Sequence, residues 1–220
     1  MHVRIQAPWQ RFAGYLKRIR ADARMISVER GSGMSEELII RHCSPTLAGL
    51  KTANMFSCVY DEAHALNGAI RAFNKRLGKK GLRMIPLRFG KERALIYVYR
   101  PDKLKNDLCD PLSRRLLTER GYDCASCGRC IGRLMERIKQ GGDFPHEIGL
   151  FLGYAPDDVK CFMHDPNEGL LCTGCWRVYA NEAEKKRLFA RFQKCTEVYK
   201  RCFSEGITLE RLTVACGDTI

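Results

Sequence analysis

The stretch LRMIPLRFGKERALIYVYR, from Leu82 to Arg100, decides the fold of this chain. Two β-rich runs, residues 82–88 and 93–100, flank a short loop that contains a glycine, and this pattern predicts a β-hairpin. Pro86 has no backbone N–H to donate, so the first run is expected at a sheet edge or at a bulge. The hairpin therefore indicates a small, mostly antiparallel sheet.

Helices are predicted on both sides of the hairpin. Leu66, Ile70, Phe73 and Leu77 recur at the spacing of one buried helical face that ends at Gly78. Along the chain, strands are followed by helices, and there is a hairpin but no regular β-α-β alternation. This order favours an α+β domain packed from a small sheet and several helices. The other predicted elements are strands at 54–60 and 176–180, helices at 35–42 (stopped by Pro45), 101–120 (broken at Pro111), 127–140, 146–152, 157–163 and 182–203, and a last ordered segment at 209–214.

Composition limits the class of protein. With 220 residues, 45% of them hydrophobic, the chain can bury a core without disulfide bonds. Its longest apolar runs, such as residues 94–99, are far shorter than the roughly 20 residues that span a bilayer, which excludes a membrane span. The first residues also lack the apolar segment of a secretory signal. We therefore expect a cytoplasmic protein with reduced thiols.

The N-terminal segment differs from the rest of the chain. Residues 1–33 contain seven basic and two acidic residues, which give +5 of the formal net charge of +13. We interpret them as a basic extension that is non-native or disordered, with Met34 as the expected native start and residues 34–220 as one domain. The alternative is a surface-binding helix, because Trp9, Phe12 and Leu16 would share one helical face.

The chain has 12 cysteines, and five of them form two groups, Cys124-x-x-Cys127-x-x-Cys130 and Cys172-x-x-Cys175. The triplet matches three positions of a bacterial ferredoxin run, in which thiolates hold iron, but the fourth cysteine is missing. A zinc or iron site is predicted if the two groups meet in the fold. Alternatively, Cys127 and Cys130 pack as small apolar side chains on a helix.

A second hypothesis is a thiol-dependent enzyme with Cys43 as nucleophile and His146 as base. Cys43 precedes Ser44, and if Ser44 caps a new helix, the helix dipole favours the thiolate. If Cys43 only ends the preceding helix, the dipole acts the other way. His146 shares a predicted helical face with Gly149 and Gly153, which leaves room for a ligand or permits close helix packing.

A third hypothesis is an RNA-binding module that uses the basic hairpin. Aromatic side chains that stack on bases and cations that follow phosphates are typical of such surfaces. The alternative is the solvated side of a half-buried hairpin, and no known RNA-binding or helix-turn-helix signature is present. The residues concerned are Arg83, Arg88, Lys91, Arg93 and Arg100, beside Tyr97 and Tyr99.

Three segments carry a resemblance to a known family: HCSPTLAGLK at 42–51, FPHEIGLFLGY at 144–154 and CWRVY at 175–179. Together they resemble the domain of unknown function 3793, a family of anaerobic Gram-positive bacteria, over residues 34–215. The resemblance implies no catalytic residue, and it implies an association with redox or iron handling. We therefore expect a cysteine-rich accessory protein that is redox-associated or binds zinc or iron, with a redox protein as a possible partner.

Overall fold

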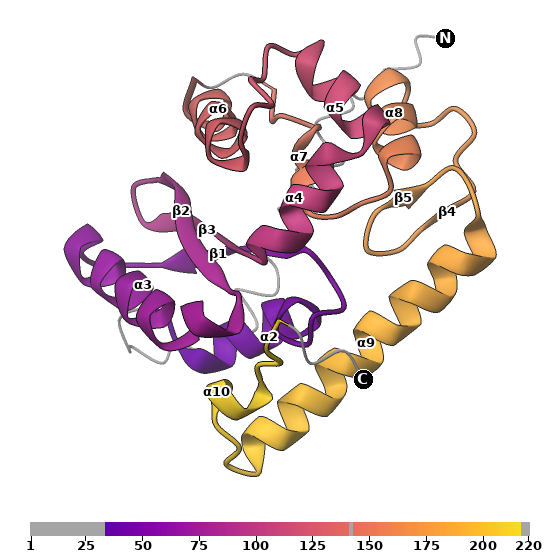
Figure 1. Cartoon of the computed structure of the whole chain (residues 1–220). Helices are drawn as coiled ribbons and strands as arrows, with labels where there is room; N and C mark the ends of the chain where they lie inside the picture. Colours follow the sequence, from indigo (N-terminus) through magenta and orange to yellow (C-terminus); the bar gives the residue numbers. More distant parts are fainter. Residues whose placement is uncertain (1–33, 141–142, 217–220) are drawn as a thin grey trace, which may run out of the picture.

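The computed structural model describes residues 34–140 and 143–216 (Figure 1), so the predicted extension at 1–33 lies outside the described residues. The fold is α+β, as predicted. Its elements are α2 (Glu36–Leu47), β1 (Ala53–Val59), α3 (Ala63–Leu77), a short 3-10 turn (Gly78–Lys80), β2 (Arg83–Phe89), β3 (Arg93–Tyr99), α4 (Pro101–Cys109), α5 (Pro111–Thr118), α6 (Cys127–Gln140), α7 (Ile148–Phe151), α8 (Pro156–His164), β4 (Cys172–Thr173), β5 (Arg177–Val178), α9 (Glu182–Ser204) and α10 (Leu209–Leu212).

The predicted hairpin forms the centre of an antiparallel sheet with the strand order β1-β3-β2. β3 lies in the middle, with Ile96 opposite Phe56 of β1 and Val98 opposite Met84 of β2. β2 is an edge strand, and its register shifts between Pro86 and Arg88. The missing N–H of Pro86 therefore falls at an edge and beside a bulge, where it costs no central ladder bond.

The two faces of the sheet carry separate layers because successive side chains of a strand point to opposite sides. Ala94, Ile96 and Val98 pack with α2, α3, α10 and the end of α9. Tyr97 and, at its margin, Leu95 pack instead with α4 to α8. Figure 1 shows these two groups of helices on either side of the sheet. No helix in the described ranges is long and apolar enough to cross a membrane.

Helix α2 is longer than predicted. It begins after Ser35, whose Oγ accepts the N–H of Leu38, but it continues through Pro45 to Leu47. Pro45 lacks only a donor, and its carbonyl accepts the N–H groups of Leu50 and Lys51, which closes the end of the helix. The helix break predicted at residues 42–45 is therefore wrong, and Ser44 does not cap a new helix because its hydroxyl donates to Ile40 O.

Arg100 is buried, which corrects its prediction as part of a basic nucleic-acid surface. It is 2% exposed, and its guanidinium group donates to backbone carbonyls of Thr46, Leu47 and Val214, each at 2.7 Å. A weaker contact reaches Lys80 O at 3.3 Å. The same hairpin also buries Tyr97, whose hydroxyl donates to Phe151 O.

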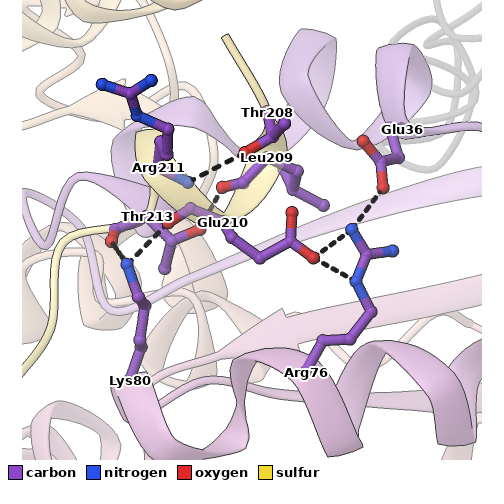
Figure 2. A network of polar contacts seen from close by, with 8 residues as sticks. All are labelled: Glu36, Arg76, Lys80, Thr208, Leu209, Glu210, Arg211 and Thr213. Atoms are coloured by element: carbon purple, nitrogen blue, oxygen red, sulfur yellow. Dashed lines mark hydrogen bonds and ion pairs between the residues drawn. The ribbon is translucent and has the colours of Figure 1, made fainter.

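A polar network around α10 connects the C-terminal segment to α2, to α3 and to the 3-10 turn that follows α3 (Figure 2). Lys80 Nζ donates to Glu210 O at 2.6 Å and to Thr213 O at 2.8 Å. Arg76 of α3 pairs with Glu210 and, at 2.7 Å, with Glu36 of α2. These contacts hold the last described residues against α2 and α3, where the side chain of Arg100 meets them.

Candidate functional site

The three segments of the resemblance meet around the side chain of Lys51. Lys51 follows α2, Tyr154 follows α7, and Trp176 lies in the β4–β5 turn. The Nζ of Lys51 lies 5.2 Å from the ring centroid of Tyr154. That ring stacks on Trp176, with the centroids 4.6 Å apart. Residues more than 100 positions apart in the sequence thus form one site, which we call the Lys51 site.

The residues on either side of Lys51 fix the position of its backbone. Gly49 adopts a left-handed φ of 74°, which lets the chain turn back after α2. Thr52 Oγ1 donates to Asp107 Oδ2 of α4 at 2.5 Å, and Thr52 O accepts the N–H of Arg100 at 2.9 Å. These bonds join the Lys51 segment to the sheet end and to α4.

A buried carboxylate positions the Trp176 side of the site. Asp158 of α8 is 1% exposed and accepts Nε1–H of Trp176 at 2.8 Å. It also accepts the backbone N–H groups of Tyr179 at 2.8 Å and Ala180 at 3.3 Å. On the other side, the ring of Phe189 of α9 meets the Trp176 ring edge-on at 4.6 Å between centroids. The indole therefore has one defined orientation.

The electrostatics of the site are dominated by the burial of Lys51. Its side chain is 8% exposed, and burial lowers its pKa to about 8, while the nearby thiols of Cys175 and Cys43 act in the opposite direction. Within residues 34–140 and 143–216, Lys51 forms no ion pair with a carboxylate. A lysine with this pKa exchanges its proton near neutral pH, which an ordinary surface lysine does not.

The two thiols near Lys51 differ in access. Cys175 is exposed in the β4–β5 turn; desolvation raises the pKa of its thiol, and Lys51 lowers it. Cys43 is fully buried inside α2, and burial raises its pKa far above the ordinary value, again with Lys51 opposing. The structure thus places Cys43 in an apolar core, where a thiolate is strongly disfavoured.

His146 lies in the turn before α7, away from Cys43. Its ring meets Phe162 edge-on with 5.0 Å between centroids, and desolvation lowers its pKa. Cys43 belongs to the core on the α2–α3 side of the sheet, whereas the segment of His146 packs on the α4–α8 side. The structure therefore does not bring the predicted nucleophile and base together.

The predicted metal ligands occupy two separate regions. Cys124, Cys127 and Cys130 lie at the start of α6, against the core formed with α4 and α5. Cys172 instead packs beside Trp176 and Phe192, while Cys175 lies within electrostatic range of Lys51. In the described part of the chain, no group of three or more His, Cys, Asp or Glu side chains is placed to hold a metal ion. A zinc or iron site on these residues stays a prediction.

The predicted bare face of Gly149 and Gly153 is filled by neighbouring side chains. A Cβ at Gly149 would lie 2.8 Å from Val159 and 3.1 Å from Tyr154. At Gly153, which has a φ of +71°, it would lie 2.7 Å from Thr52. Both glycines thus allow α7 to approach the Lys51 site closely, as the packing alternative states.

Replacing Gly149 with alanine is expected to destabilise the protein by about 1–3 kcal/mol, because Val159 and Tyr154 must move in a packed core. Urea denaturation measures this change. The matched control is Gly132→Ala in α6, where an added Cβ would meet no other described part of the chain within 4 Å beyond its own helix backbone, and alanine is expected to stabilise the helix by about 0.5–1 kcal/mol. Equal effects of the two substitutions would contradict the packing role of Gly149.

Sequence reasoning did not identify Lys51 as a site residue. Its only signal was its position at the end of the 42–51 segment, since an isolated lysine is normally solvated. The features that distinguish it, which are burial and the approach of Tyr154 and Cys175, come from distant parts of the chain.

Comparison with known protein families gives a match over most of the chain. The profile of a family described as "Protein of unknown function (DUF3793)" matches residues 39–213. No curated protein and no solved structure matches the chain. The matched range covers the sheet, both helical layers and every residue of the Lys51 site.

Proposed function

The chain belongs to the DUF3793 family of proteins of unknown function, and we propose that it acts in thiol–disulfide exchange through Cys175, with Lys51 as its proton acceptor and donor. The observation that carries this proposal is the burial of Lys51 beside Tyr154 and within electrostatic range of the exposed thiol of Cys175; burial lowers the pKa of Lys51 to about 8. A buried cation without an acidic partner is costly to keep, so a role beyond packing is favoured.

Cys175 suits this reaction because the residue lies exposed in a tight turn. The β4–β5 hairpin closes with Gly174 N–H donating to Trp176 O at 3.0 Å. Trp176 is anchored beneath the turn by Asp158. A disulfide of another protein can therefore approach Cys175 from solvent, whereas Lys51 itself is buried. This supports a redox partner protein rather than a small enclosed substrate.

The step follows from the ordinary chemistry of thiols. The Cys175 thiol transfers its proton to the neutral amine of Lys51, and the resulting thiolate attacks one sulfur of the partner disulfide. The partner S–S bond breaks as the mixed disulfide forms, and the departing thiolate takes the proton from the Lys51 ammonium group. An external thiol then attacks the partner sulfur of the mixed disulfide: its S–S bond to Cys175 breaks, a new disulfide forms between the partner and that thiol, and Cys175 leaves as a thiolate that takes up the proton of the attacking thiol. A pKa of about 8 allows Lys51 to accept and donate this proton near neutral pH.

Alkylation rates test the proposal, because the matched thiol Cys172 lies in the same hairpin with a different charge environment. Desolvation raises the pKa of Cys172, Glu182 raises it further, and Lys186 opposes. We expect Lys51→Met to slow iodoacetamide labelling of Cys175 about tenfold at pH 8, because an opposite charge is lost. Labelling of Cys172 should stay the same. Mass spectrometry of tryptic peptides gives both rates.

Lys186→Met is the matched control, since it removes the cation beside Cys172 and leaves Lys51 in place. It should leave the rate at Cys175 unchanged. Incubation with oxidised glutathione then tests the reaction itself, and the wild-type protein should form its mixed disulfide first at Cys175. Equal labelling of Cys175 in the wild type and Lys51→Met, or mixed disulfides spread evenly over the exposed cysteines, would refute the proposal.

A further inference from the structure

A second polar site includes the residues that precede α7, whereas Tyr154 of the Lys51 site follows this helix. It is a small hollow of about 190 Å³ between the end of α5, α6 and the turn before α7. Arg120, Arg137, His146 and Glu147 line it, together with Phe144 and Met163. This volume is below the range of drug-sized ligand pockets, so the hollow suits one small group.

Glu147 forms the floor of the hollow. It is 1% exposed, and Tyr122 donates its hydroxyl hydrogen to Oε1 at 2.8 Å. The Nε of Arg137 lies 2.7 Å from the same oxygen, and the Nε of Arg120 lies 3.9 Å from Oε2. One buried carboxylate is therefore placed between two guanidinium groups, of which it can neutralise one.

The guanidinium groups keep donor capacity toward the hollow. The Nε of Arg137 is engaged by Glu147 at 2.7 Å, which leaves the two terminal amino groups of this guanidinium as donors for a ligand. About a third of each arginine side chain is exposed, 31% for Arg120 and 32% for Arg137. The other acid of the lining, Asp143, is exposed, so solvent screens its charge.

We propose that this hollow binds the phosphate group of a small molecule, with Arg120 and Arg137 as its ligands. Arginines from two elements present donors in different directions, which suits a tetrahedral, multiply charged oxyanion. Glu147 holds Arg137 in place and is itself held by the hydroxyl group of Tyr122. Phe144 and Met163 supply an apolar wall beside the phosphate.

Calorimetric titration of the full chain with inorganic phosphate, at constant ionic strength with chloride, tests this site. We expect one phosphate per chain, and Arg120→Gln should weaken binding at least about tenfold, because a charge-assisted hydrogen bond is lost. Arg115→Gln is the matched control: Arg115 lies on α5, is 63% exposed and pairs with Glu119. It should bind phosphate as the wild type does.

The Glu147→Gln variant distinguishes a phosphate-binding site from a cluster in which the arginines only pair with Glu147. Loss of the competing carboxylate should tighten phosphate binding several-fold, whereas a purely structural cluster would show no such gain. If Arg120→Gln unfolds, Arg120→Lys keeps the charge but not the planar fork and should weaken binding.

Phenyl phosphate is the second ligand that we would titrate. Tighter binding than inorganic phosphate assigns the site to organic monoesters, and equal binding assigns it to free phosphate. Absence of binding at about 10 mM phosphate, or equal affinity in Arg120→Gln, would overturn the proposal.

Discussion

Arg100→Met is expected to destabilise the protein by about 3–5 kcal/mol, the largest loss we predict for a single substitution. The guanidinium group is the common donor for carbonyls at the end of α2 and in the C-terminal segment. Methionine fills similar space but donates no hydrogen bond, so Val214 O loses this donor, while Thr46 O and Leu47 O keep only the N–H groups of Gly49 and Val214. An unsatisfied buried acceptor costs about 1–3 kcal/mol.

Urea denaturation of Arg100→Met and of Arg88→Met measures this effect. Arg88 lies exposed on β2, and its loss should change the free energy of unfolding by less than about 0.5 kcal/mol. Hydrogen exchange gives an independent readout, because the N–H of Val214 donates to Leu47 O beside the guanidinium group. Protection of this amide should fall in Arg100→Met. Equal stability of the two variants would show that the C-terminal segment is held without Arg100.

Lys51→Met is expected to change stability in the opposite direction at neutral pH. Burial lowers the pKa of Lys51 from 10.5 to about 8, so the folded state binds its proton less tightly than the unfolded state does. Each pH unit between these values corresponds to about 1.4 kcal/mol. Removing this group should therefore stabilise the protein by up to about 3 kcal/mol at pH 7.

The gain should disappear as the pH rises. Between pH 8 and 10.5 the unfolded chain keeps the proton on Lys51 while the folded protein loses it, so wild-type stability rises relative to Lys51→Met. The difference between the two proteins isolates this effect, because other groups with shifted pKa values are common to both. Lys186→Met, which replaces an exposed lysine paired with Glu182, is the control and should show no comparable gain.

Denaturation at a series of pH values from 7 to 10.5 provides the measurement. A Lys51→Met protein that is less stable than the wild type at every pH would show that Lys51 is a packing residue. The predicted gain would mean instead that the fold keeps a destabilising charge at the Lys51 site. Stability given up at one position is typical of sites that perform chemistry.

Much of the architecture follows from local sequence patterns. The β-rich run at 93–100 predicts the strand that β3 forms, and Leu66, Ile70, Phe73 and Leu77 are all buried in α3 as predicted. Pro86 indicates an edge or a bulge, and both are present in β2. These signals are reliable because they depend on the period of the backbone itself. The end of α2 was mispredicted because Pro45 removes only one donor, and tertiary contacts stabilise the last turn.

The environments of the buried charges and of the thiols, in contrast, were decided only by tertiary structure. Sequence alone assigns lysine and arginine to the surface, because an isolated charge is costly to bury. Lys51 is buried because the Tyr154 and Trp176 segments meet above it, and Arg100 because carbonyls from distant segments surround its guanidinium group. Cysteine spacing along the chain likewise did not show that Cys43 is enclosed while Cys175 is exposed. The sequence by itself determined which segments form strands and helices, because that depends on residues close together in the chain. Only the packed fold decides which charges and thiols share one environment, because these residues come together from distant parts of the chain.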